Sequence, residues 1–142
     1  LSRTGTGGGY GDHVDKALMG DGARRVRTDL SFTLFLTPPD AYEGGELTVS
    51  LPGGEVSARP EAGDLILYPS GAIHRVEPVT RGERLAFIGW IESEVRAADQ
   101  REILFDLENI RAELGRSLDP GAPVHLALDK VAGQLARMWS ES

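Results

Sequence analysis

The stretch Leu30-Ser-Phe-Thr-Leu-Phe-Leu-Thr-Pro-Pro39 combines aromatic, aliphatic and β-branched residues with a proline stop. Such residues favour strands, and a Pro-Pro pair cannot continue the hydrogen-bonding ladder of a sheet. The stretch therefore predicts a strand over residues 30–37. The same alternation of short strands with glycine or proline turns continues on both sides of it.

Turn residues separate several further apolar runs. Gly44-Gly45, Pro52-Gly53-Gly54 and Pro69-Ser70-Gly71 are the clearest breaks. We expect strands at residues 46–51, 55–59, 65–68, 72–77 and 84–92, the last two forming a pair joined by a turn at residues 78–83. About seven strands at this spacing, counted from Tyr10, are typical of a sandwich or barrel.

After Glu92 the apolar residues recur at every third or fourth position, which is typical of helices. The two stretches that show this spacing are Ile103, Leu107, Ile110 and Leu114, and then Val124, Leu128, Val131, Leu135 and Met138. A break between Gly115 and Pro123 divides them. The predicted architecture is thus mainly β, with a core domain over residues 1–93 and a C-terminal α-helical segment over residues 94–142.

The composition narrows the classes of function. The 142 residues include 15 Lys and Arg against 22 Asp and Glu, a formal net charge of −7, and the basic residues are scattered along the chain. This disfavours nucleic acid as a partner. No apolar run predicts a membrane span and no signal peptide is visible, which fits a cytoplasmic protein. Without cysteine, any metal must be held by His, Asp or Glu.

The chain has three histidines, His13, His74 and His125, and the first lies two residues before Asp15. Residues i and i+2 of a strand project from one face, so His13 and Asp15 can offer an imidazole nitrogen and a carboxylate oxygen to one ion. His74, which begins a strand after a tight turn, is the candidate third ligand. We expect His125 to be structural or exposed.

Two histidines and one carboxylate form the facial triad of non-haem Fe(II) oxygenases, which leaves coordination positions open for a bidentate 2-oxo acid and O₂. Arg84, ten residues after His74, opens an apolar strand. Its planar guanidinium suits the distal carboxylate of such an acid. We therefore predict His13, Asp15 and His74 as the catalytic metal ligands and Arg84 as the anchor of 2-oxoglutarate.

Other polar residues fit more than one interpretation. Tyr10 suits a position that faces the metal about as well as a position in the core. Ser31 and Thr33 share one strand face and would add hydroxyl groups near Arg84, although β-propensity alone also explains them. Asp64, beside a glycine, has the character of a turn residue.

Several segments resemble the PKHD-type hydroxylases, a bacterial branch of the prolyl-4-hydroxylase-like Fe(II)/2-oxoglutarate oxygenases. These segments are Tyr10–Asp15, Arg27–Ser31, Gly44–Leu47, Ala62–Ser70 and His74–Gly82, with Leu104–Leu107 and Arg137–Trp139 in the helical part. The resemblance implies a double-stranded β-helix, or jelly roll, followed by helices. It also implies His13, Asp15 and His74 as iron ligands, and Arg84 on 2-oxoglutarate.

The activity implied by the resemblance is hydroxylation of an unidentified small-molecule or peptide substrate. Fe(II), 2-oxoglutarate and O₂ take part, succinate and CO₂ are released, and ascorbate is expected as a supporting reductant. Asp15 fills the position that halogenating relatives leave for chloride, so hydroxylation is favoured over halogenation. Two alternatives stay open: a non-catalytic cupin-like domain that holds Zn²⁺ or Ni²⁺, and an inactive truncated fragment.

The family also carries a helix-and-strand segment ahead of the residues with which this chain begins. We expect its absence to leave one edge of the jelly roll open. An open edge invites cover by the helices of residues 94–142 or pairing with another chain, so we expect a homodimer.

Overall fold

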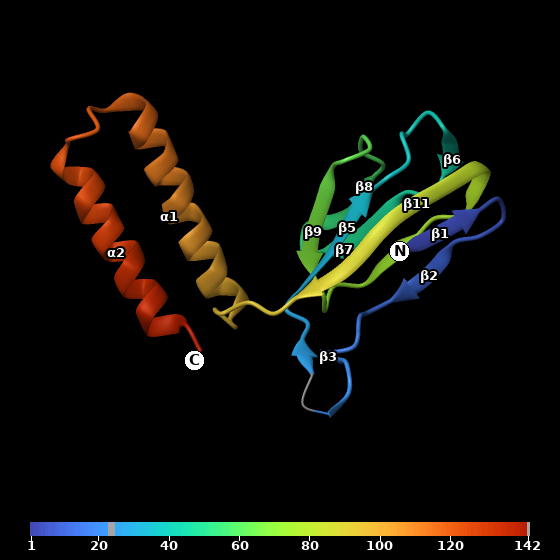
Figure 1. The fold of residues 1–142 in the computed structure, drawn as a ribbon, viewed down its shortest axis with the longest axis horizontal. Coiled ribbons are helices and arrows are strands. Elements are labelled where there is room, and N and C mark those ends of the chain that lie inside the picture. The colour runs from blue at the N-terminus through green and yellow to red at the C-terminus, as the bar shows by residue number, and fades with distance from the viewer. Residues whose placement is uncertain (23–24, 142) are drawn as a thin grey trace. The chain divides into compact units, whose positions relative to one another are not determined.

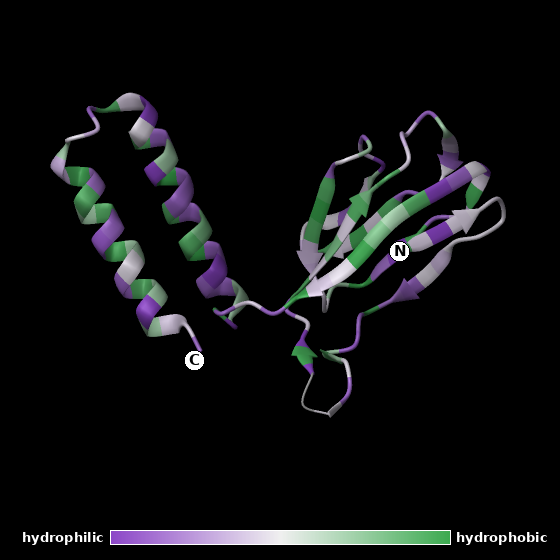
Figure 2. Ribbon diagram, viewed as in Figure 1, coloured by the Kyte–Doolittle hydropathy of each residue, from purple (hydrophilic) through white to green (hydrophobic). Residues whose placement is uncertain are grey.

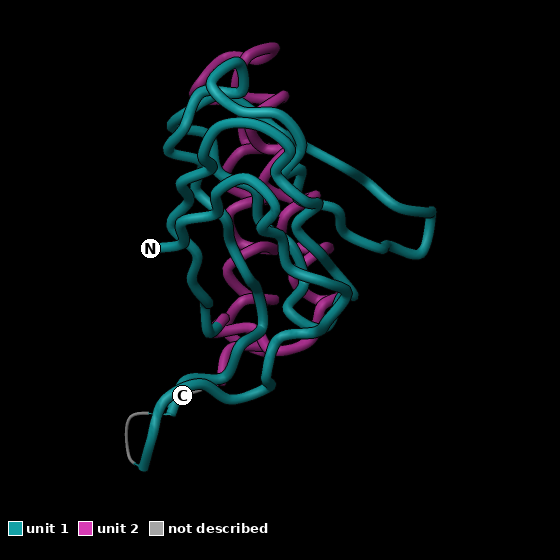
Figure 3. The backbone as a smooth tube through the Cα atoms, turned by 90° about the vertical axis from the view of Figure 1, so that its right-hand side faces the viewer, with its two compact units in different colours: residues 1–92 teal, residues 93–142 magenta. Residues whose placement is uncertain are grey.

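The computed structural model describes residues 1–22 and 25–141, which form eleven strands and two helices (Figure 1). In chain order the elements are β1 (Ser2–Gly5), β2 (Tyr10–His13), β3 (Leu18–Met19), β4 (Val26–Arg27), β5 (Leu30–Phe35), β6 (Tyr42–Gly44), β7 (Leu47–Leu51), β8 (Gly54–Ala58), β9 (Leu65–Pro69), β10 (His74–Val76), β11 (Val79–Ile91), α1 (Ala98–Ser117) and α2 (Pro123–Trp139). They fall into two compact units, Leu1–Glu92 and Ser93–Ser142 (Figure 3). The strands belong to the first unit and the helices to the second.

Two antiparallel sheets make up most of the first unit. One has the strand order β1-β11-β5-β9, with β6 paired to β11, and the other has the order β2-β10-β7-β8. Strands β3 and β4 form a separate ribbon. Both sheets contribute to a small core of Phe35, Leu47, Val49 and Tyr68. The predicted mainly β core followed by C-terminal helices is confirmed.

Strand β5, which contains most of the Leu30–Pro39 stretch, lies between β11 and β9 and alternates strictly in burial. Ser31, Thr33 and Phe35 are buried, whereas Phe32 packs on the other face of the sheet beside Gly89 of β11. A Cβ at Gly89 would lie 2.6 Å from the Phe32 ring, so a larger residue there would displace the ring. β5 thus turns two hydroxyl groups and one aromatic ring toward the interior.

The other face of the same sheet carries partly exposed apolar side chains. Leu67 of β9 and Phe87 of β11 are 49% and 47% exposed. Figure 2 shows the hydrophobic stretches along both strands. The inward face of this sheet therefore carries more polar side chains, and its outward face more apolar side chains, than we would expect if the fold only buried hydrophobic residues.

Two expectations about the last strands are wrong. The predicted turn at residues 78–83 is mostly strand, because β11 already begins at Val79 and its first part pairs with β6. β10 and β11 are also not partners. β10 pairs with β2 and β7 in one sheet, and β11 pairs with β1 and β5 in the other. The chain changes sheets between them, so His74 and Arg84 come from different sheets.

The second unit is a hairpin in which α1 packs against α2. The half-buried leucines of the predicted apolar stripes are Leu107, Leu114, Leu128 and Leu135. No residue of either helix is fully buried. Arg111 Nη1 of α1 lies 2.9 Å from Asp129 Oδ1 of α2 and links the two helices. Within the described residues, neither helix is long and apolar enough to cross a membrane.

Candidate metal and co-substrate site

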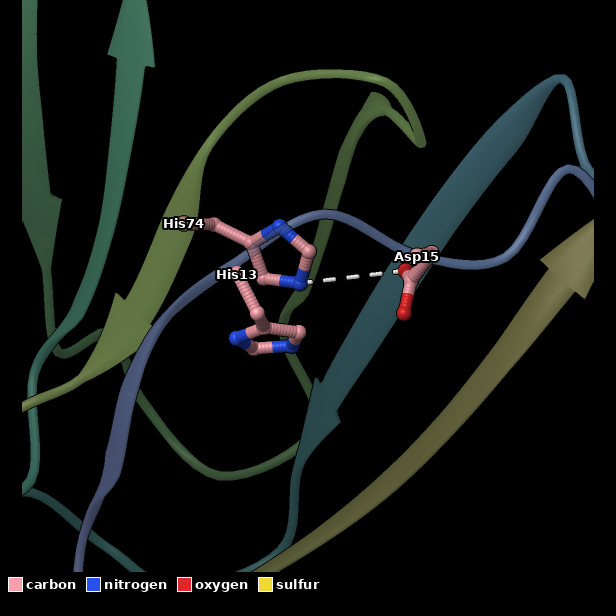
Figure 4. A group of neighbouring side chains, drawn as sticks. All are labelled: His13, Asp15 and His74. Atoms are coloured by element: carbon pink, nitrogen blue, oxygen red, sulfur yellow. Dashed lines mark ion pairs between the residues drawn. The ribbon is translucent and has the colours of Figure 1, made fainter.

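Three side chains from two segments of the first unit converge in one place (Figure 4). His13 ends β2, Asp15 follows it outside the strand, and His74 begins β10. His13 and His74 are direct neighbours across the β2–β10 pair. One ligand atom from each of the three residues lies within 4.8 Å of the other two. The structure thus brings together the three residues predicted as metal ligands.

Asp15 reaches this place in a different way from the one expected. Because β2 ends at His13, strand geometry does not hold Asp15, and Val14 between the two residues is 54% exposed. The Asp15 backbone N–H donates to the Ser70 carbonyl at 3.2 Å, and Ser31 Oγ donates to Asp15 Oδ2 at 2.6 Å. Contacts with two other segments, rather than i, i+2 spacing, therefore orient the carboxylate.

Backbone carbonyls orient both imidazole rings. His13 Nδ1 lies 2.8 Å from the Gly11 carbonyl oxygen, and His74 Nδ1 lies 2.9 Å from that of Ala72. A carbonyl oxygen only accepts hydrogen bonds, so each Nδ1 carries the proton and each Nε2 presents a lone pair. Metal-binding histidines are held in this manner, with the second ring nitrogen donating to a carbonyl or carboxylate.

The electron-rich atoms of the three residues lie close together. His74 Nε2 is 3.7 Å from Asp15 Oδ2, and the ring centroids of His13 and His74 are 4.1 Å apart. Atoms of this kind repel one another unless a proton or a metal ion lies between them. Two imidazole nitrogens and one carboxylate are the donor set of non-haem iron sites, and they also suit other divalent transition metals.

The site adjoins a cavity of about 720 Å³, which is within the size range of small-molecule sites. Side chains that carry polar groups into its lining include His13, Asp15, His74, Thr33, Tyr68, Arg84 and Trp90. The cavity is therefore large enough for a small organic acid next to a metal ion.

Arg84, the predicted co-substrate anchor, lines this cavity and is only 1% exposed. Its guanidinium carbon lies 5.1 Å from the centre of the Phe35 ring. Among the described residues, none accepts a hydrogen bond from Arg84 Nε or Nη2. Burial lowers the pKa of Arg84, but an arginine stays charged in a protein. The Tyr42 hydroxyl supports the charged form of Arg84, but a buried guanidinium whose Nε and Nη2 lack acceptors among the described residues is unfavourable, so the position suits an anionic ligand.

Neighbouring residues shape the space around this guanidinium. Gly45 has a φ of +69°, and a Cβ there would lie 3.1 Å from Arg84 Cδ, so both conformation and space require glycine. The Tyr68 ring packs edge-on against the His74 ring, with centroids 4.9 Å apart. Burial raises the pKa of Tyr68, which keeps its hydroxyl protonated and able to donate.

The sequence interpretation missed Tyr68, Ser70 and the role of Gly45. Gly44-Gly45 has the pattern of an ordinary turn, and Tyr68 and Ser70 stand in a plain strand and turn. Their proximity to the site follows from the pairing of β9 with β5, where Tyr68 is opposite Ser31. The available signal was the segment Ala62–Ser70, which resembles the PKHD-type hydroxylases.

Tyr10 lines the cavity of the site, whereas His125 belongs to the helical unit. Tyr10 is 62% exposed, and its ring centroid lies 4.3 Å from that of His13, so it shields the edge of the imidazole. His125 lies in α2, with its Nε2 3.1 Å from the Asp119 carbonyl oxygen. This contact gives His125 a local structural role in the helical unit.

Comparison with known proteins places the chain in a family. Residues 1–92 match the 2OG-Fe(II) oxygenase superfamily. The chain belongs to this superfamily. The PKHD-type hydroxylase of Hyphomonas neptunium is 50% identical over 141 residues, which cover 99% of this chain and 63% of that protein. A PKHD-type hydroxylase of Maricaulis maris is 49% identical over 141 residues, which cover 99% of this chain and 62% of that protein. The oxygenase chain thus spans about three fifths of the length of these relatives.

A solved structure supports the same family. The crystal structure of a Pseudomonas putida prolyl-4-hydroxylase aligns with a TM-score of 0.52 and 31% sequence identity, over 64% of this oxygenase chain and 49% of that chain. The resemblance to PKHD-type hydroxylases and the jelly-roll fold class are confirmed. The superfamily name specifies Fe(II) and 2-oxoglutarate, and the His-Asp-His group with the nearby Arg84 is compatible with both.

Proposed function

We propose that this 2OG-Fe(II) oxygenase hydroxylates a small-molecule or peptide substrate, consumes 2-oxoglutarate and O₂, and releases succinate and CO₂. His13, Asp15 and His74 hold the iron, and Arg84 binds the distal carboxylate of 2-oxoglutarate. One observation carries the proposal. The Arg84 guanidinium is buried, with Nε and Nη2 lacking partners among the described residues, on the wall of the cavity that the His-Asp-His group also lines.

Bound Fe(II), together with 2-oxoglutarate and O₂, supplies the oxidising chemistry. The residues of the chain bind and orient the reactants. Two imidazoles and one carboxylate leave part of the coordination sphere to a co-substrate. The planar Arg84 guanidinium can form two parallel charge-assisted hydrogen bonds with one carboxylate. Phe35 covers the guanidinium at 5.1 Å and limits access of water to that ion pair, which strengthens it.

A metal-binding domain without catalysis would use the same three ligands, but it gives no reason for the buried arginine. A second donor in the cavity supports the enzymatic interpretation. Trp90 lines the cavity, and its Nε1 is buried without a hydrogen-bond partner among the described residues. Two residues of one cavity, Arg84 and Trp90, thus have N–H groups without acceptors, and this favours a ligand that has acceptor oxygens.

Ascorbate is part of the proposal only as a supporting reductant that restores Fe(II) after uncoupled turnover. The homodimer remains a prediction from the sequence. Light scattering at micromolar protein concentration tests it: the mass of two chains is expected, and the mass of one chain would contradict it.

Succinate release tests the proposed reaction. The chain is loaded with Fe(II) and 2-oxoglutarate without O₂, then exposed to O₂ without primary substrate. We expect slow succinate release that ascorbate prolongs, that Asp15→Ala abolishes, and that His125→Ala leaves unchanged. Binding of Fe(II) and 2-oxoglutarate without any succinate would favour an inactive fragment. Failure to bind 2-oxoglutarate at all would contradict the assigned site.

A further inference from the structure

The carboxylate of Asp15 contacts a buried hydroxyl group that the proposed reaction does not use. Ser31 Oγ lies 2.6 Å from Asp15 Oδ2 and 2.8 Å from Ser70 Oγ. Ser31 and Ser70 are each 2% exposed. The three residues come from β5, from the turn after β9 and from the segment after β2. Three parts of the β unit thus meet at one side chain of the metal site.

Ser31 is the donor in both of these contacts, to Asp15 Oδ2 and to Ser70 Oγ. A hydroxyl has a single proton, and hydrogen bonds to an ionised carboxylate are stronger than those to a neutral hydroxyl. The Ser31 proton therefore favours Asp15, and the Ser70 hydroxyl is a second, weaker acceptor beside it.

Asp15 needs such support more than the two histidines do. Carbonyl oxygens fix the imidazole rings, and both histidines lie in paired strands. Asp15 lies beyond the end of β2. Its backbone is held there by the hydrogen bond from its N–H to the Ser70 carbonyl. Among the described residues, Ser31 is the one hydrogen-bond donor to the Asp15 carboxylate.

We infer that Ser31 is a positioning residue that orients the Asp15 carboxylate for the metal. The inference rests on the proposed metal site. A hydrogen bond to Oδ2 restricts rotation of the carboxylate, yet it leaves the remaining lone pairs free for the ion. Outer partners of this kind raise metal affinity because the ligand is already oriented before the metal arrives.

Manganese binding by the full chain tests the inference, with the electron paramagnetic resonance signal of free Mn(II) as the readout. Ser31→Ala is expected to raise the Kd for Mn(II) by roughly 10–100-fold, the usual effect of losing an outer-shell partner. Ser31→Thr keeps the hydroxyl, at a position on the cavity wall. It is expected to restore binding to within about threefold of the parent, because the donor is retained.

Ser70 gives a second variant within the same group. Ser70→Ala removes the competing acceptor and leaves the Ser31 proton on Asp15, so this variant is expected to bind Mn(II) at least as tightly as the parent. A loss of affinity as large as that of Ser31→Ala would contradict the inference.

A matched control separates positioning from a general loss of stability. Thr48 is 0% exposed, its hydroxyl lies 2.7 Å from Ser57 Oγ, and it lies outside the cavity lining. Thr48→Val is expected to keep the Kd for Mn(II) and the visible ligand-field bands of bound Co(II). Ser31→Ala is expected to change both, because the arrangement of the ligands around the ion changes.

The outcomes distinguish this inference from the proposed function. A parent chain that binds no divalent metal would overturn the metal site itself. A parent that binds Mn(II), together with a Ser31→Ala variant that binds it equally well, would overturn only the role of Ser31. Equal weakening of Mn(II) binding by Ser31→Ala and Thr48→Val would also overturn the role of Ser31. If Ser31→Ala does not fold, the pair Ser31→Val and Ser31→Thr decides, because the two side chains differ only in the hydroxyl, and equal Mn(II) affinity in both variants contradicts the inference.

Discussion

The β unit and the helical hairpin bury different kinds of side chain. Every buried polar or charged side chain in the described residues belongs to the β unit, and the set comprises Thr28, Ser31, Thr33, Thr48, Ser70, His74 and Arg84. The two helices bury no residue fully. They depend on half-buried leucines and on surface ion pairs such as Arg111–Asp129.

This difference in buried polar side chains indicates which of the two units can hold a reactive site. Burial of a polar group is unfavourable unless the group is paired, so a fold driven by stability alone keeps such groups outside. The β unit buries several of them around one cavity and leaves the Arg84 guanidinium without a protein acceptor for Nε and Nη2 among the described residues. The helical hairpin has no comparable group. The chemistry that the structure supports therefore lies in the β unit.

Removal of a metal ligand is expected to have the largest effect. Asp15→Ala or His74→Ala should weaken Fe(II) binding by more than the roughly 10–100-fold typical of an outer-shell contact, because a direct bond to the ion is lost. His125→Ala, in the helical unit, is the matched control and should bind as the parent does. Anaerobic calorimetry measures the Fe(II) affinity of the ligand variants and of the control. Parental affinity in His74→Ala would remove that residue from the ligand set.

Truncation of the core should separate the two units by stability. Phe35 is 0% exposed, so Phe35→Ala is expected to lower the unfolding free energy of the β unit by about 3–5 kcal/mol. Ile110 of α1 is 48% exposed, so Ile110→Ala should lower the unfolding free energy of the hairpin by only about 1 kcal/mol. In a Trp139→Phe background, Trp90 fluorescence reports on the β unit and circular dichroism reports on the helices. Equal losses would contradict the comparison.

Loss of the buried cation should affect the co-substrate and not the metal. Arg84→Ala is expected to weaken 2-oxoglutarate binding by about 1.5–3 kcal/mol, roughly ten- to a hundredfold, because a charge-assisted hydrogen bond is lost. Arg81→Ala is the control, since Arg81 lies on the same strand but is exposed and paired with Glu43 at 3.0 Å. Isothermal titration of 2-oxoglutarate into the Mn(II)-loaded chain gives the Kd for 2-oxoglutarate of each variant. An unchanged Kd in Arg84→Ala would assign the anchor to another residue.

The smallest effect is expected in the helical unit. The Arg111 and Asp129 side chains are 48% and 50% exposed. Solvent screens exposed pairs of this kind and they contribute little to stability, so Arg111→Ala should lower the unfolding free energy of the hairpin only slightly. Added salt should narrow the difference from the parent. Urea denaturation followed by circular dichroism measures it, and a loss as large as that of Phe35→Ala would show a stronger interaction than the exposure indicates.

The sequence predicted the kinds of elements better than their pairing. The turn residues and apolar runs indicated a mainly β core, and the three- to four-residue spacing after Glu92 indicated the helices. The sequence did not predict that β10 and β11 lie in different sheets, because partner choice depends on long-range contacts that no local pattern contains. Ser2–Gly5 also forms a strand without an apolar pattern, since it pairs with β11.

The candidate site was predictable in its residues but not in its support. His13, Asp15, His74 and Arg84 were selected by side-chain chemistry, and the structure brings the first three together beside the cavity that Arg84 lines. The reason given for Asp15 was incomplete, because it lies beyond its strand and depends on hydrogen bonds from other segments. The inward direction of Ser31 follows from the sheet register.

The most direct test of the site is an anaerobic titration of the chain with Fe(II) and 2-oxoglutarate, followed by visible absorption. Chelation of iron by a 2-oxo acid gives a weak charge-transfer band. We expect this band to appear only when both are present and to saturate at one equivalent of each per chain. Asp15→Ala should lack the band, and Arg84→Ala should require more 2-oxoglutarate to reach it. Absence of the band from a chain that binds Fe(II) would contradict the assignment of this cavity to 2-oxoglutarate.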